Sequence, residues 1–112
     1  MAKLFYKYYQ GNVLSKSSRE YLLQIMEKTV TGANRIKGLL PKGTIVAHKT
    51  GSSGTNGEGI TAATNDAGII TLPSGHHVIL VVFVSNSKDN DKTRNEVIAK
   101  ISKAVWDFYA RS

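Results

Sequence analysis

The feature that most constrains the fold is a run of seven apolar residues, Val78 to Val84, in which polar and apolar positions do not alternate. The run follows a turn at Pro73-Ser74-Gly75 and predicts a β-strand over residues 76–84. Because every side chain in the run is apolar, both faces of the strand need cover from other elements. The rest of the chain must therefore supply strands that pair with this one and helices that cover the sheet.

Two more strands are expected before this run. Residues 44–50 form the first, residues 51–59 are a glycine-rich connection, and residues 60–72 form the second. The polar residues Thr64-Asn65-Asp66 interrupt the second strand, and we interpret them as a bulge. The tight turn then leads into the apolar strand, so the sequence predicts a three-stranded antiparallel meander.

The segments before and after these strands have apolar residues at helical spacing. This spacing predicts a helix in residues 1–10 and a second helix that begins at Ser15 or Ser17. A long last helix, with cap candidates Asp89 and Asp91, has an apolar stripe from which Trp106 is absent: Val97, Ile98, Ile101, Ala104, Val105 and Phe108. The predicted fold class is α+β, with two N-terminal helices, the meander and a long C-terminal helix.

The amino-acid composition limits the classes of partner that the chain can bind. Fifteen Lys and Arg residues against eight Asp and Glu give a formal charge of +7, which favours anionic partners. The basic residues are scattered without a basic run or a reading helix, so we do not expect nucleic-acid binding. There are no cysteines, which excludes disulfides and thiolate metal sites, and no run reaches the roughly 18 apolar residues of a membrane span. The N-terminus is charged before a signal peptide could form, so either the chain is cytoplasmic or a longer chain begins upstream.

Residues 47–54 hold the most suggestive chemistry, because a cation, hydroxyls and glycines follow an apolar strand. Such a segment can hold an anion, but it contains no base or activated nucleophile. The glycine-rich connection lacks the lysine and helix of a phosphate-binding loop, and residues 51–54 lack the spacing of a nucleophile elbow. The three histidines lack metal-ligand spacing with carboxylates, and we interpret the adjacent pair, His76 and His77, as polar residues at a hairpin end.

In order and spacing, these segments resemble the C-terminal part of a class A serine β-lactamase, of the extended-spectrum, Bacteroidetes-type branch. The resemblance covers essentially the whole chain and is carried by the following segments: Leu14-Ser15-Lys16, Thr31 to Arg35, Leu40 to Gly43, His48 to Gly54, Ala62 to Ile70, and Val82 to Ser85. It implies a single partial domain over residues 1–112, in which residues 1–43 end a helical region and residues 44–112 are the C-terminal part of an α/β domain.

The resemblance also implies roles for individual residues. Lys49 would support the substrate carboxylate electrostatically, and the Thr50 hydroxyl would bind it. Gly51 would allow close approach of the ligand, and the backbone N–H of Ser52 would form half of the oxyanion hole. Arg35, from the preceding connector, would reach the same carboxylate. The substrate would be a β-lactam, and neither a metal nor a cofactor is implied.

The chain departs from the family in lacking, before Lys49, the Ser-x-x-Lys nucleophile, the Ser-Asp-Asn triplet and the glutamate that activates water. Its one Ser-x-x-Lys, Ser85 to Lys88, follows the triplet and is interpreted as a chance match. We therefore expect a C-terminal fragment that is inactive alone, from a periplasmic or secreted parent. The open edge of the 76–84 strand would pair with the missing N-terminal portion or with a second copy.

Two alternatives stay open at this point. A penicillin-binding transpeptidase also uses a Lys-Thr-Gly triplet and would differ by failing to release its acyl product. A non-catalytic, basic interaction module would use the charged surface and the open strand edge without any reaction.

Overall fold

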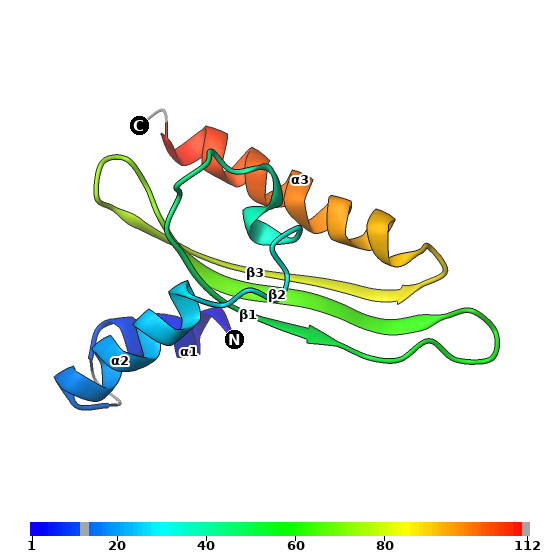
Figure 1. Ribbon diagram of the computed structural model, residues 1–112, viewed down its shortest axis with the longest axis horizontal. Helices are drawn as coiled ribbons and strands as arrows, with labels where there is room; N and C mark the ends of the chain where they lie inside the picture. Colours follow the sequence, from blue (N-terminus) through cyan, green and yellow to red (C-terminus); the bar gives the residue numbers. More distant parts are fainter. Residues whose placement is uncertain (12–13, 111–112) are drawn as a thin grey trace.

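The computed structural model describes residues 1–11 and 14–110. It confirms the predicted α+β fold, with a three-stranded sheet between helices (Figure 1). The elements are, in chain order, α1 (Ala2–Tyr9), α2 (Lys16–Glu27), the 3-10 helix η1 (Ile36–Leu39), β1 (Val46–Ser52), β2 (Thr61–Thr71), β3 (His77–Ser87) and α3 (Asp91–Ala110). In Figure 1, α3 lies on one side of the sheet, and α1 and α2 lie on the other, where α2 contacts β1 and α1 contacts β3 and β2.

The sheet is an antiparallel meander in the order β1-β2-β3, as predicted. The predicted bulge at residues 64–66 is wrong, because Thr64, Asn65 and Asp66 pair in unbroken register with both neighbouring strands. These polar residues stay in the strand because two of their side chains have buried partners: Thr64 accepts from Arg94, and Asp66 contacts His48. The third strand is also longer than predicted and continues to Ser87.

The main core lies between the sheet and the helices α3 and η1. Ile36 from η1 and Ile98 from α3 are both fully buried, and they pack with residues of all three strands: Val46, Ile70 and Val82. The predicted stripe of α3 is partly wrong, because Trp106 is buried at 8% exposure whereas Phe108 is 68% exposed. Apolar residues occur on more than one side of this helix, and periodicity alone did not indicate which side faces the sheet.

The helix starts differ in detail from the predictions. Ser15 caps α2 by accepting the Ser18 N–H at 3.3 Å, one of the two predicted possibilities. The cap of α3 is Asn90, whose Oδ1 accepts the Thr93 N–H at 2.8 Å, rather than Asp89 or Asp91. Asparagine is as good a cap as aspartate because both side chains present an oxygen to the free N–H groups of the first turn.

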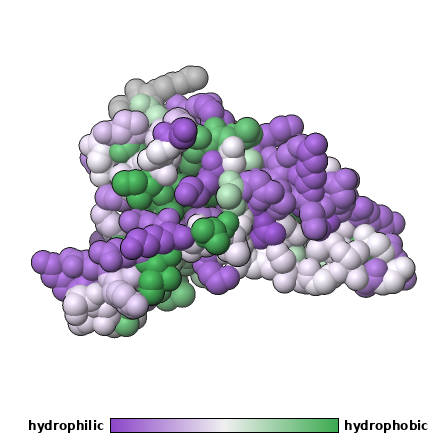
Figure 2. Space-filling view, viewed as in Figure 1, coloured by the Kyte–Doolittle hydropathy of each residue, from purple (hydrophilic) through white to green (hydrophobic). Residues whose placement is uncertain are grey.

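The two N-terminal helices pack loosely. No described residue of α2 is buried, and Tyr21 and Ile25 of its predicted apolar face are 68% and 47% exposed. Figure 2 shows hydrophobic residues gathered in the half of the molecule that holds these helices, whereas the half that holds the residue 53–60 loop is neutral to hydrophilic. Within the described residues, no helix combines the length and the apolar character that crossing a bilayer requires.

Candidate active site

The segment from Lys49 to Ser52 forms the end of β1, which is an outer strand of the described sheet. Ser53 N–H donates to Ala63 O at 2.9 Å, and Thr71 N–H donates to Ile45 O at 3.0 Å. These two bonds show that odd-numbered residues of this strand bond to β2, because antiparallel partners bond at every second residue. The N–H groups of Thr50 and Ser52 therefore point away from β2, toward the open edge.

Lys49 and Thr50 project to opposite faces of the strand, as alternation requires. Lys49 is exposed, and its Nζ donates to Thr50 O at 2.7 Å. Thr50 is half-buried against the connector at Gly32, where an added Cβ would lie 2.2 Å from Thr50 Cγ2. The close approach and the φ of +70° both favour glycine at position 32. Both side chains can still reach one ligand if that ligand lies beside the strand edge.

Arg35 reaches the same strand end from the connector. Its guanidinium donates to four acceptors: Asn95 Oδ1 at 2.9 Å, Asn65 O at 2.8 Å, Gly51 O at 3.3 Å and Ser52 Oγ at 2.7 Å. Partial burial lowers the pKa of Arg35, the Asp66 carboxylate acts in the opposite direction, and the positive charge of Arg94 lowers the pKa further. The structure thus brings the predicted arginine to the predicted strand end.

These contacts decide which donors remain for a ligand. The Nε–H and both Nη1–H groups of Arg35 have acceptors within the described residues, and Nη2 uses one of its two hydrogens on Ser52 Oγ. Since Ser52 Oγ accepts that bond, its own hydrogen can be donated elsewhere. An anion at this edge would meet one guanidinium N–H and one hydroxyl, in place of a free guanidinium fork.

A buried ionisable pair lies behind this edge, and sequence reasoning missed it. His48 and Asp66 are both 0% exposed, and His48 Nδ1 lies 3.0 Å from both carboxylate oxygens. Asp66 Oδ2 also accepts the Ile36 N–H at 3.2 Å. Strand alternation places residues 48 and 50 on one face, but only the register shows that Asp66 shares that face.

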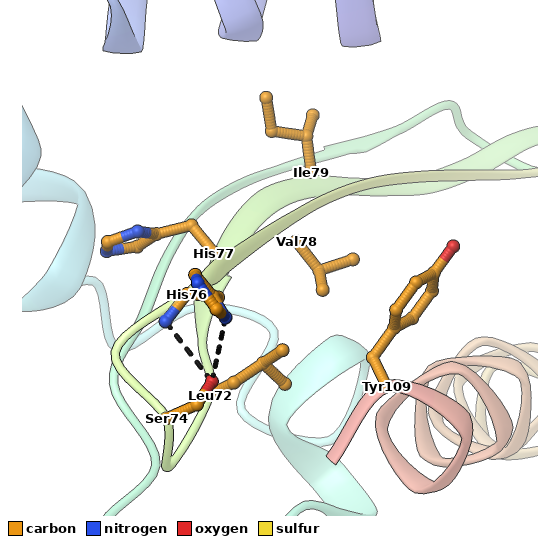
Figure 3. A pocket seen from close by; sticks show the side chains of 7 residues that line it. All are labelled: Leu72, Ser74, His76, His77, Val78, Ile79 and Tyr109. Atoms are coloured by element: carbon orange, nitrogen blue, oxygen red, sulfur yellow. Dashed lines mark hydrogen bonds between the residues drawn. The ribbon is translucent and has the colours of Figure 1, made fainter. Parts of the chain in front are cut away.

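The other two histidines lie at the hairpin between β2 and β3, as predicted. Figure 3 shows them at a hollow at the end of the sheet away from Ser52, with Val78 pointing toward the ring of Tyr109. His76 Nδ1 lies 3.2 Å from Ser74 Oγ, and the His77 ring contacts Tyr9 with a centroid separation of 4.8 Å. No group of three or more metal-ligating side chains occurs in residues 1–11 and 14–110.

The chain is similar in sequence to known β-lactamases. Residues 1–109 match the model of the β-lactamase enzyme family. The chain belongs to this family. It is 50% identical over 100 residues to the β-lactamase VEB-1 of Pseudomonas aeruginosa, with 89% of the chain and 33% of the relative covered. It is 45% identical over 107 residues to the extended-spectrum β-lactamase PER-1 of the same species, covering 96% of the chain and 34% of that relative.

Solved β-lactamases share the fold closely. The chain superposes on the TLA-1 extended-spectrum β-lactamase with a TM-score of 0.95 and 54% identity, covering 97% of the chain and 40% of that structure. A class A β-lactamase from Bacteroides cellulosilyticus gives a TM-score of 0.96 at 38% identity, with 99% and 40% covered. These relatives confirm the class A resemblance. The chain spans about a third of the length of the curated β-lactamases that it matches.

Proposed function

We propose that this chain forms the carboxylate-binding and oxyanion-binding wall of a class A serine β-lactamase. The observation that carries the proposal is that the Ser52 N–H points to the open edge of β1 and the Arg35 guanidinium bonds the Ser52 hydroxyl at the same strand end, in a member of the β-lactamase family. Lys49 adds a positive charge beside them. The positive charges of Lys49 and Arg35 and the outward N–H groups of this edge suit an anionic substrate group.

In the proposed reaction, a serine from the rest of the protein attacks the carbonyl carbon of a β-lactam ring. The carbonyl oxygen becomes an oxyanion, and the outward N–H of Ser52 stabilises it. The ring C–N bond then breaks to give an acyl-serine, and water hydrolyses that ester. Meanwhile Lys49, Thr50 and Arg35 hold the substrate carboxylate, and Gly51 leaves room for the ligand at the backbone.

The nucleophile would come from the part of the protein that precedes residues equivalent to this chain in the longer relatives. We propose that residues 1–43 end its helical region and residues 44–112 complete its α/β domain. The outer edge of β3 has no strand partner among the described residues, so we propose that it pairs with that preceding portion. We also propose a periplasmic or extracellular location for the whole protein, where β-lactams act.

The test is reconstitution of activity. The chain alone should not hydrolyse nitrocefin, and mixing it with the N-terminal portion of the TLA-1 β-lactamase should produce hydrolysis. Lys49→Ala should abolish this activity, whereas Lys42→Ala, which removes the same charge from an exposed connector position, should retain it. Turnover by the chain alone that Lys49→Ala abolishes would contradict the proposal that the nucleophile lies elsewhere.

Assembly through the β3 edge has its own test. Light scattering after size exclusion should show a dimer of the chain alone, because an open strand edge recruits a second copy when its usual partner is absent. Adding the N-terminal portion of TLA-1 should convert the dimer to a one-to-one complex. A chain that remains monomeric in both conditions would refute pairing at this edge.

The second candidate function is that of a penicillin-binding protein, and similarity to one solved structure supports it. The chain superposes on PBP-A, solved as an acyl-enzyme with penicillin G, with a TM-score of 0.81 and 32% identity over 99% of the chain. Mass spectrometry of the reconstituted complex separates the two functions. A stable acyl adduct without turnover would indicate a penicillin-binding protein, and rapid loss of the adduct would indicate a β-lactamase.

A further inference from the structure

The buried pair His48–Asp66 links two segments of the candidate site that are distant in sequence. His48 precedes Lys49 on β1, and Asp66 lies on β2 opposite Thr50. Because an ionised carboxylate can only accept hydrogen bonds, the proton between them belongs to His48 Nδ1. His48 Nε2 is buried and has no hydrogen-bond partner within the described part of the chain. Asp66 is therefore the sole polar contact of this imidazole that the structure shows.

The same carboxylate holds the connector. Asp66 Oδ2 accepts the Ile36 N–H at 3.2 Å, and Ile36 is 0% exposed. Ile36 begins η1 and directly follows Arg35 in the chain. One carboxylate thus contacts the strand of the Lys49–Ser52 segment through His48 and the segment of Arg35 through Ile36. Two apolar side chains of the same size would fill this space, but they would leave the buried Ile36 N–H without an acceptor.

The position of Arg35 depends on where its backbone lies. Its guanidinium reaches β1, β2 and α3 at once, through Ser52 Oγ, Asn65 O and Asn95 Oδ1. A long side chain can make these contacts together only if its Cα is held in place, because the side chain is otherwise free to adopt many rotamers. Asp66 holds the backbone immediately after Arg35, and Gly32, whose carbonyl accepts the Arg35 N–H at 3.0 Å, abuts Thr50 before it.

We propose that His48 and Asp66 form a positioning couple that fixes the connector against β1 and so places the Arg35 guanidinium at the Ser52 edge. This inference rests on the proposed role of Arg35 in carboxylate binding. Neither member of the couple reaches the open edge, so both are positioning residues and not catalytic ones. Asp66 supplies two acceptors for two buried donors, His48 Nδ1–H and Ile36 N–H.

Asp66→Asn tests the couple with little change in volume. A carboxamide has one oxygen, which can accept from either His48 Nδ1–H or Ile36 N–H. Its NH₂ group then faces the remaining donor and cannot accept from it. In ¹H–¹⁵N NMR spectra of the chain, we expect hydrogen exchange at Arg35 Nε–H to accelerate by about tenfold, the size of losing one hydrogen bond to a charged group. The internal control is Arg94 Nε–H, which donates to Thr64 Oγ1 at 2.9 Å and has no bond to Asp66. Equal acceleration at both arginines, or at neither, would overturn the proposal.

A measurement on the unsubstituted chain covers the case in which Asp66→Asn does not fold. If the couple holds the connector, Ile36 N–H and Arg35 Nε–H must open together and show similar protection in native-state exchange. An Arg35 Nε–H that exchanges freely beside a protected Ile36 N–H would contradict the couple without any substitution.

Kinetics of the chain reconstituted with the N-terminal portion of TLA-1 test the consequence for the site. Asp66→Asn should raise KM for nitrocefin, which carries a carboxylate, by about tenfold with a smaller change in kcat. Asp107→Asn, at a partly exposed position on α3, is the matched control and should leave both constants unchanged. Absence of activity with the unsubstituted chain would count against the proposed function, and the exchange experiments would still decide the couple. An unchanged KM in Asp66→Asn would refute its role at the site.

Discussion

Gly68→Ala is the substitution whose cost follows most directly from the sheet geometry. Gly68 is buried on β2, opposite His48 on one side and Leu80 on the other. An added Cβ would lie 2.8 Å from Ala47 O and 2.9 Å from His48 Cβ. Both distances are shorter than van der Waals contact, and neither atom can turn away, because one is backbone and the other is attached directly to it. The two strands must therefore separate locally to admit the methyl group.

The expected cost can be worked out from this overlap. Overpacking of a buried site costs about 1–3 kcal/mol, and the loss of unfolded-state freedom on replacing glycine offsets about 0.4–1 kcal/mol. The middles of these two ranges leave a net cost of about 1.3 kcal/mol. For a domain of about 100 residues, each kcal/mol shifts Tm by about 4–8 °C, so we expect a fall of roughly 5–10 °C.

Thermal unfolding followed by circular dichroism measures this fall. Gly54→Ala is the matched control, because an added Cβ there has no heavy atom within 4 Å and no positive φ is required. We expect its Tm to remain the same or to rise slightly. If Gly68→Ala and Gly54→Ala unfold at the same temperature, the close approach of β1 and β2 at His48 is wrong, and with it the placement of the imidazole beside Asp66.

Two further predictions concern α3. Trp106→Ala should destabilise the chain by about 3–5 kcal/mol, whereas Phe108→Ala, at 68% exposure, should cost far less; denaturant unfolding of the pair checks which side of the helix packs. Asn90→Ala should cost about 1 kcal/mol because it removes the acceptor for the Thr93 N–H, and Asp89→Ala should cost less; equal losses would show that Asn90 is not the cap.

The sequence predicted the fold class and the segment at the β1 edge, because both depend on local patterns. Apolar runs bounded by turn residues predict the meander, and the run from Lys49 to Ser52 carries its chemistry in adjacent residues. The side of α3 that packs was not predictable in the same way. Trp106 is buried because η1 and the sheet meet that side of the helix, and this depends on tertiary contacts that periodicity does not contain.

The His48–Asp66 pair was missed for a different reason. Charged residues are rarely fully buried, so a polar interruption of a strand is more readily interpreted as a bulge than as a buried contact. The two residues are 18 positions apart, and only the pairing of β1 with β2 brings them together. Ile36 N–H, the second donor to Asp66, comes from a third segment. The sequence of any one of these three segments therefore does not predict the contact between His48 and Asp66.

Arg35 shows how far a residue type can be interpreted before the structure is known. Either lysine or arginine at position 35 would place a positive charge near Lys49. Only arginine has the planar guanidinium that bonds Asn95, Asn65 and Ser52 together. Three of the four acceptors of Arg35 belong to the protein backbone or to amide side chains, which leaves its positive charge uncompensated by them. The guanidinium is thus held by hydrogen bonds to neutral groups, and the buried Asp66 carboxylate offsets part of its positive charge without bonding to it directly.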